Sequence, residues 1–321
     1  MATPIILDVD TGIDDAVAMM LAVSSRRMDI KAVTTTFGNS NVNMTTLNTL
    51  KVLELLGAVN IPVAHGAAKG ILSPMKAAQR GRPALGTDGM LGMSDALPYP
   101  GRSPDEQGAC ALMEKVVKEA DSKAIIVCMG PLTNAAIFLL AHPECRDMLS
   151  GIVVTGGSSD RGDVLPTVEF NMASDPEAAH IVFSSGVRIM MCGLDVTEKA
   201  YLTFDEREKI KLRGGRLADF LYPPLRKLGE YEEETLLKDG CPIRDPVSVA
   251  WLLNPSIFKS EPCRVSIDLT GRYTRGTTIC EPYRKGGPYP NALIATGIDR
   301  DAYVSMITEA FASYAGSVTD F

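Results

Sequence analysis

The sequence predicts a single α/β domain over residues 1–321, with an open, mostly parallel sheet flanked by helices. Two observations support this fold class. Apolar, β-branched runs alternate with helical patterns, and each such run ends in glycine and polar residues. No linker interrupts the chain. Because the loops at the carboxyl ends of the strands line the binding crevice of such a sheet, the polar clusters are expected to converge there.

The elements of the first two thirds of the chain follow this alternation. Strands are expected at 5–9, 29–37, 61–64, 123–129, 152–155 and 187–192. Helices are expected from Ala16, at 44–56, at 105–119, after Gly130 and after Asp175. The segment 69–102 is rich in glycine and proline and has little periodicity, so it is expected to be a long mobile loop.

The last third of the chain is mainly helical before it returns to strands. Helical patterns cover 204–216, 217–239 and 246–253, and a final helix is expected at 299–314. Strands are expected near 263–268, 272–280 and 292–296. Within the helical part, 223–243 carries a run of glutamates and is expected to be a second mobile loop that is exposed to solvent.

Composition narrows the possible partners and the cellular location. A net charge of −7 argues against a nucleic-acid surface, because phosphate binding requires clustered lysine and arginine. No apolar run is long enough to span a membrane, and aspartates come too early for a signal peptide, so a cytoplasmic protein is expected. The seven cysteines have no CxxC spacing and are expected to be buried free thiols.

A cluster of acidic residues follows the first expected strand. Four aspartates, Asp8, Asp10, Asp14 and Asp15, lie within eight residues, and an apolar helical pattern starts directly behind them. Carboxylates this close repel one another unless a cation is bound between them, and hard divalent cations prefer oxygen ligands. The first hypothesis is therefore a metal site.

Several motifs, taken together, resemble the inosine-uridine-preferring nucleoside hydrolase family. They are DVDTGIDDA from Asp8, Gly38-Asn39, GPLTN from Gly130, EFN from Glu169, DPEAA from Asp175, and Asp245-Pro246. The resemblance implies a nucleoside hydrolase fold with a Rossmann-like core, assembled as a homodimer or homotetramer. It also implies a calcium-dependent enzyme of purine or pyrimidine salvage that splits ribonucleosides into ribose and free base.

The resemblance also assigns roles to residues. Asp10, Asp15, Asp245 and the backbone carbonyl of Met129 would hold Ca²⁺, and Asp14, Asn39, Glu169 and Asn171 would bind the ribose hydroxyls. Asp10 would be the general base for a calcium-bound water that attacks the anomeric carbon through an oxocarbenium-like transition state. Simpler alternatives stay open: Asp8 as support for the turn, Asp14 as a helix cap, and Asn39 and Asn171 as partners of turn backbone.

The sequence departs from the family pattern around the leaving base. Arg244 replaces a histidine that protonates the departing base, and a guanidinium cannot donate its proton at neutral pH. Arg244 is therefore either an electrostatic stabiliser of the leaving group or the partner of a glutamate in 230–234. Asp163 stands where the family has a ribose-binding asparagine, Leu85 replaces a second histidine, and Tyr231 is the preferred candidate for contact with the base.

Two other functions remain possible at this stage. A haloacid-dehalogenase-like phosphohydrolase also opens with a strand that ends in Asp-x-Asp-x-Thr, and Asp8 would then be the nucleophile. However, a phosphate would prefer bare N–H groups at the helix start to the two carboxylates found there. A calcium-dependent protein that binds ribose or a nucleoside without cleaving it is the second alternative, because the family histidines are missing.

Overall fold

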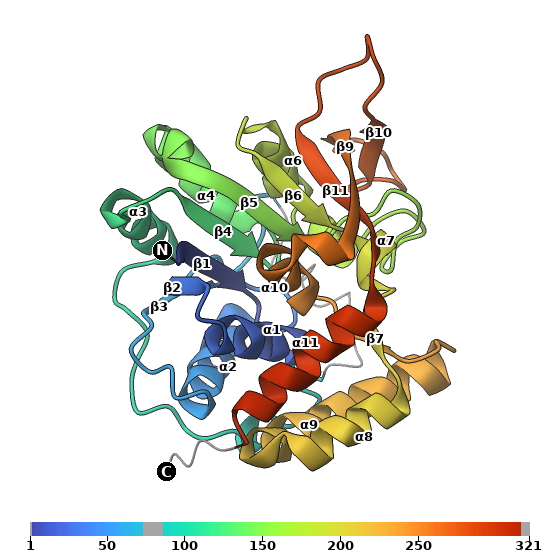
Figure 1. The fold of residues 1–321 in the computed structure, drawn as a ribbon. Coiled ribbons are helices and arrows are strands. Elements are labelled where there is room, and N and C mark those ends of the chain that lie inside the picture. Colours follow the sequence, from blue (N-terminus) through green and yellow to red (C-terminus); the bar gives the residue numbers. More distant parts are fainter. Residues whose placement is uncertain (1, 73–85, 316–321) are drawn as a thin grey trace.

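The structure is a computed structural model that describes residues 2–72 and 86–315. Its centre is a sheet in the order β10-β9-β11-β6-β5-β4-β1-β2-β3 (Figure 1). Neighbours from β11 to β3 in this order pair in parallel, and β9 is antiparallel to both β10 and β11. This confirms the predicted single-domain α/β fold with a mostly parallel sheet.

The strands of this sheet are β1 (Thr3–Val9), β2 (Met28–Thr35), β3 (Val63–His65), β4 (Ala124–Cys128), β5 (Leu149–Thr155), β6 (Ile189–Cys192), β9 (Phe258–Ile267), β10 (Thr278–Pro282) and β11 (Ala292–Ile298). A separate short ribbon pairs β7 (Tyr201–Leu202) with β8 (Cys241–Pro242).

The helices cover both faces of the sheet. One face carries α3 (Ala109–Glu119), α4 (Thr133–Ala141) and α6 (Pro176–Ser184). The other carries α1 (Ile13–Ser24), α2 (Val42–Leu55), α8 (Phe204–Arg213), α9 (Gly215–Glu230), α10 (Pro246–Leu253) and α11 (Arg300–Ser313). Shorter elements are α5 (Phe170–Ser174), α7 (Leu194–Thr197), η3 (Ser94–Ala96), η4 (Pro143–Met148), the π-helical η5 (Tyr231–Thr235) and η6 (Pro255–Ile257).

The central strand β1 explains why the acidic cluster lies where it does. Its side chains alternate between the two cores, with Ile5 and Leu7 on the α1 side and Ile6 on the α4 side. Asp8 takes the next position on the α4 side, and Asp10 follows the end of the strand. Since β1 pairs in parallel with both β2 and β4, these carboxylates emerge in the middle of the carboxyl edge of the sheet.

The structure corrects the limits of two expected elements. Helix α3 begins at Ala109 instead of 105, because Asp105 forms a bridge to Ala64 and its N–H donates to Val63 O at 2.7 Å. Strand β10 begins at Thr278 instead of 272. The preceding residues are held in a turn, where the Asp268 carboxylate accepts the N–H groups of Thr270 and Gly271.

The two expected loops differ in outcome. Residues 73–85 of the 69–102 segment lie outside the described residues, whereas 86–92 form glycine-containing turns that precede η3. The expectation of a loop at 223–243 is wrong for its first half, because α9 continues to Glu230 and η5 follows it. Buried side chains of α9, Leu217, Leu221, Leu225 and Leu228, pack on the core and account for the helix despite Pro223 and Pro224. Mobility of either segment stays a prediction.

The expectation of buried free thiols is met in part. All seven cysteines are free, and Cys110 and Cys280 are the two that are not fully buried. Trp251 is buried in α10 and stacks on Phe258 with 5.3 Å between ring centroids. No helix of the described part of the chain is both long and apolar enough to cross a membrane.

Candidate active site

Asp10 is held in a close-fitting backbone pocket at the end of β1. Its Oδ2 accepts the N–H of Asn39 at 2.7 Å. A Cβ on Gly38 would lie 2.0 Å from Asp10 Oδ2, and one on Gly130 would lie 2.8 Å from Oδ1. Both neighbours must therefore be glycine for the carboxylate to fit between the loops that follow β2 and β4.

Asp15 and Asp14 occupy the first turn of α1. Helix α1 starts at Ile13 with Gly12 as its N-cap, and it is Asp15 whose Oδ2 accepts the Gly12 N–H, at 2.8 Å. The capping role that was open for Asp14 thus falls to Asp15. Asp15 Oδ2 also accepts from Asn39 Nδ2 at 3.3 Å, while its buried Oδ1 has no hydrogen-bond partner. Burial raises the pKa of Asp15 to about 6, and the charge of Asp14 adds to the effect.

Asp8 has the contacts of a supporting residue. Its Oδ1 accepts from Thr34 Oγ1 at 2.6 Å and from Asn134 Nδ2 at 2.8 Å, which joins β1 to β2 and α4. Its Oδ2 is buried without a hydrogen-bond partner, and burial raises the pKa of Asp8 to about 7. Asn134 also accepts the N–H of Ala67, so it fixes the loop after β3.

Asn171 and Glu169 lie at the start of α5, next to the ends of β4 and β5. Asn171 Nδ2 donates to Met129 O at 2.8 Å and to Thr155 O at 2.9 Å. Glu169 is the N-cap of α5, and its Oε2 accepts the N–H groups of Gly157, Asn171 and Met172. Burial and then the charge of Asp163 raise the pKa of Glu169 to about 7.

Arg244 is buried and paired with two carboxylates. Its Nη2 and Nε donate to Glu198 Oε1 at 2.7 and 3.0 Å, and its Nη1 donates to Glu232 Oε1 at 3.1 Å. Of the two roles open for Arg244, the ion pair with a glutamate of 230–234 is the one present here. Its backbone N–H donates to Asp14 Oδ2 at 3.2 Å, so the segment that contains Asp245 lies next to the aspartates that follow β1.

Asp245 follows Arg244 and is the N-cap of α10. Asp14 and Asp245 both act on the buried Tyr303, whose pKa is raised by burial first and then by these two charges. Tyr303 in turn donates to Ile243 O at 2.7 Å. Four buried carboxylates lie at this edge of the sheet, those of Asp10, Asp14, Asp15 and Asp245. They come from chain segments more than 200 residues apart.

The loop at 86–92 lies against this site, and no residue of the loop was predicted to have this role. A Cβ on Gly12 would lie 3.1 Å from Gly89 O, and Ser40 Oγ donates to Thr87 O at 2.7 Å. Asn48 of α2 donates both to Thr11 O at 3.0 Å and to Asp88 O at 2.8 Å. The signal in the sequence was weak, since it is only a buried asparagine inside a helical pattern.

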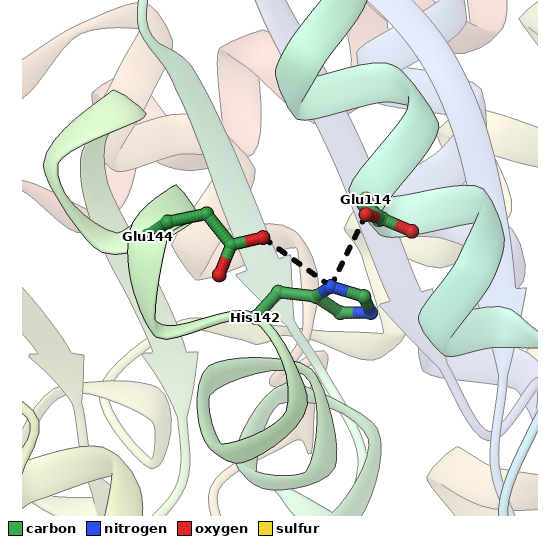
Figure 2. Close-up of side chains that lie close together, drawn as sticks. All are labelled: Glu114, His142 and Glu144. Atoms are coloured by element: carbon green, nitrogen blue, oxygen red, sulfur yellow. Dashed lines mark ion pairs between the residues drawn. The ribbon is translucent and has the colours of Figure 1, made fainter.

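The other described group with metal-ligating side chains lies elsewhere. Figure 2 shows Glu114, His142 and Glu144, whose ligand atoms lie within 4.8 Å of one another. Lys118 Nζ already pairs with Glu114 at 2.6 Å and with Glu144 at 3.2 Å. One lysine ammonium thus offsets part of the charge of these carboxylates. His142 follows α4, which leads the chain back toward the start of β5, so the group lies away from Asp10.

The geometry can be compared with known proteins at this point. The model of the family described as inosine-uridine preferring nucleoside hydrolase matches residues 5–305. The chain belongs to this family. The resemblance seen in the sequence motifs is therefore confirmed.

Individual nucleoside hydrolases support the assignment over the full chain. A pyrimidine-specific ribonucleoside hydrolase RihA from Citrobacter koseri is 38% identical over 316 residues, which cover 98% of this chain and 100% of that protein. Among solved structures, the plant nucleoside hydrolase PpNRh1 has a TM-score of 0.90 at 27% identity, with 98% of this chain and 100% of that chain covered. A purine-preferring ribonucleoside hydrolase from Gardnerella vaginalis has a TM-score of 0.89 at 28% identity, with 98% and 99% covered.

The protein is thus an enzyme, a ribonucleoside hydrolase. Family membership and the named relatives favour this activity over both alternatives, the phosphohydrolase and the non-catalytic binder. Where the resemblance implies a histidine directly before Asp245, this chain has Arg244. All three histidines of the chain are described: His142 pairs with Glu114, His65 Nε2 lies 2.8 Å from Asn43 Oδ1, and His180 is exposed on α6.

Proposed function

We propose that this nucleoside hydrolase cleaves the N-glycosidic bond of pyrimidine ribonucleosides with a water molecule whose proton passes to Asp10. The observation that carries the proposal is the fit of Asp10 between Gly38, Gly130 and the Asn39 N–H. That fit fixes the carboxylate at the centre of the acidic edge. The pyrimidine preference is supported by the names of relatives that are 37–38% identical over the full chain.

The donor set fits a hard divalent cation, and Ca²⁺ is proposed. Asp10, Asp15, Asp245 and the Met129 carbonyl supply oxygen atoms only, and Asp15 Oδ1 is a buried oxygen without a hydrogen-bond partner. When bound, Ca²⁺ would lower the pKa of a coordinated water and orient the sugar hydroxyls. Without the ion, several buried carboxylates would have to take up protons, in line with the raised pKa values of Asp8 and Asp15.

The ribose would be held by groups whose remaining hydrogen-bonding capacity faces the site. Both donors of Asn171 Nδ2 are used on Met129 O and Thr155 O, so its Oδ1 is the group left to accept from a sugar hydroxyl. Glu169 Oε2 already accepts three N–H groups, which leaves Oε1. Asn39, Asp14 and Asp163 complete the proposed ribose contacts.

The reaction proceeds as a displacement at the anomeric carbon. Asp10 takes a proton from water as the O–C bond forms and the C–N bond breaks, and the base departs with the electron pair. Positive charge develops on the ribose ring in the transition state, and the surrounding carboxylates stabilise it there. Since Glu198 and Glu232 bind the Arg244 guanidinium, the base gains its proton from solvent, and Tyr231 is the proposed contact for its ring.

Release of reducing sugar from a nucleoside panel tests this function. Uridine, cytidine, inosine and 2′-deoxyuridine are compared, each with and without a calcium chelator. Cleavage of uridine and cytidine that requires Ca²⁺ and the 2′-hydroxyl is the expected result. Equal cleavage of 2′-deoxyuridine, or full activity after chelation, would contradict the mechanism, and faster cleavage of inosine would contradict the pyrimidine preference.

A further inference from the structure

A buried cluster of charges joins three segments next to the acidic edge. The Arg244 guanidinium lies between Glu198, which follows α7, and Glu232 of η5. The side chains of Arg244 and Glu232 are buried, with 8% and 4% exposure, and that of Glu198 is mostly buried, with 14%. Lys238 pairs with the same two glutamates, at 2.5 Å to Glu198 and 3.0 Å to Glu232. The cluster thus has two cations and two anions in contact.

The cluster reaches the proposed site through the backbone of Arg244. Its N–H donates to Asp14 Oδ2 at 3.2 Å, and the next residue is Asp245. Asp14 is a proposed ribose contact and Asp245 a proposed metal ligand. A shift of Arg244 would therefore displace groups on both sides of the reaction centre.

Stability alone is a weak explanation for this arrangement. A buried ion pair costs much of its attraction in desolvation, and apolar residues of similar size are often as stabilising. What charged groups add is orientation, because a planar guanidinium that donates to two carboxylates has a fixed direction. The direction fixed here is that of the chain segment that enters α10.

We propose that Arg244 is a positioning residue, which Glu198 and Glu232 hold so that Asp14 and Asp245 stay in register with Asp10. The inference rests on the proposed function, because it assigns Arg244 an indirect part in that reaction. The cluster also ties η5, with Tyr231 at its start, to the same edge of the sheet. Residue 244 thus aligns the site here, in place of acting on the departing base.

The neighbouring glutamate provides a matched control. Glu233 lies on the same π-helical turn and also pairs with a buried arginine, since Arg207 Nη2 and Nη1 donate to its two carboxylate oxygens at 2.8 and 3.0 Å. Arg207 contacts Leu202 O and not the acidic edge. Glu233→Gln therefore weakens the ion pair with Arg207 and leaves Arg244 untouched. Glu232→Gln weakens the ion pairs with Arg244 and Lys238.

The two variants are compared by steady-state kinetics on the best nucleoside and by Tm. Misalignment of reacting groups by a fraction of an ångström is expected to lower kcat by about 10- to 100-fold in E232Q. KM should change less, and E233Q should stay within about twofold of wild type at a similar loss of Tm. Arg244→Lys, which keeps the charge, should retain more of kcat than Arg244→Met.

The outcomes separate the inference from the function on which it rests. If wild type cleaves nucleosides and E232Q matches E233Q in kcat, the inference is wrong and the function stands. If wild type cleaves none of the panel, the function fails, and Ca²⁺ affinity measured by calorimetry decides the inference. Several-fold weaker Ca²⁺ binding in E232Q than in E233Q would then support it, and equal binding would overturn it. Should E232Q fail to fold, Glu198→Gln replaces it in both comparisons.

Discussion

At the scale of single residues, two aspartates of one segment differ in what surrounds them. Asp8 is enclosed by side chains, with Thr34 and Asn134 as donors, whereas Asp10 is enclosed by the backbone of glycine-containing loops. Backbone enclosure leaves little freedom for the carboxylate to turn, which suits a group that must hold both a metal and a water. Side-chain enclosure suits a residue that joins strands.

Replacement of Asp10 tests that difference. Asp10→Asn removes the proposed base and one metal charge, and general base catalysis alone contributes about 10²- to 10⁴-fold, so kcat should fall by at least that range. Asp29→Asn is the control, because Asp29 is an exposed residue that pairs with Lys31 on the surface. Reducing-sugar release at saturating nucleoside provides the measurement. Retention of more than a tenth of wild-type kcat in D10N would rule out Asp10 as the base.

Glu169 should make stability depend on pH. Its pKa is raised from 4.5 to about 7, so the folded protein holds a proton that the unfolded chain releases between these values. The contribution is fully present below pH 4.5 and is lost as the pH rises through about 7. Glu169→Gln stays neutral and keeps an oxygen for the three N–H donors, so its advantage over wild type should grow from pH 5 to pH 8.

Urea unfolding of both proteins across this range checks the sign. Asp163→Asn serves as the companion variant, because the charge of Asp163 is the second cause of the raised pKa. That variant should shift the wild-type profile toward lower pH. A constant difference between wild type and E169Q at every pH would mean that Glu169 is ionised throughout.

At the scale of elements, loop 86–96 is fixed to α2 by buried polar groups. Asn48 donates to Thr11 O and Asp88 O and accepts from Ser94 Oγ at 2.6 Å, and Lys51 donates to Ser94 O at 2.8 Å. The Asp88 carboxylate accepts the N–H groups of Met90, Gly92 and Ser94. The loop is therefore folded on itself and on the site.

Asn48→Ala should detach this loop from the acidic edge. The change leaves buried groups without partners, which lowers the free energy of unfolding by about 1–3 kcal/mol. KM for the nucleoside should rise, because the loop no longer packs firmly against Asn39. Ser40→Ala removes one exposed hydrogen bond to the same loop and should cost less than about 0.5 kcal/mol. Chemical denaturation and steady-state kinetics measure both effects. Equal KM values for the two variants would show that the loop does not shape the site.

Elements were predictable from the sequence where one pattern dominated. The strands leading to Asp10 and Met129 are mainly apolar, so their type and order followed directly. For 223–230 two patterns competed: the helical pattern at 217–239 agrees with α9, whereas the run of glutamates wrongly favoured a loop. The partners of Arg244 could be foreseen only in part. Glu232 lay in the expected stretch, whereas Glu198 is 46 residues away and meets Arg244 through the tertiary fold.

At the scale of the whole molecule, the two edges of the parallel sheet have different roles. Strands β1, β4, β5 and β6 all end at the edge where the carboxylates gather, and the connecting helices return the chain to the opposite edge. The sequence could predict this convergence, since it follows from parallel order alone. It did not predict the group of Glu114, His142 and Glu144, whose side chains come together only in the tertiary fold.

The two groups make opposite predictions for the metal. Ca²⁺ added back to chelated wild type should raise Tm. At a hundredfold excess over Kd, binding adds about 2.7 kcal/mol to the free energy of unfolding. Asp245→Asn should abolish the rise, because it removes a ligand at the carboxyl edge. His142→Ala should keep it, because Lys118 already pairs with both Glu114 and Glu144 at the other group. Thermal unfolding with and without Ca²⁺ measures all three proteins, and a response lost in H142A but kept in D245N would place the ion at the group of Figure 2.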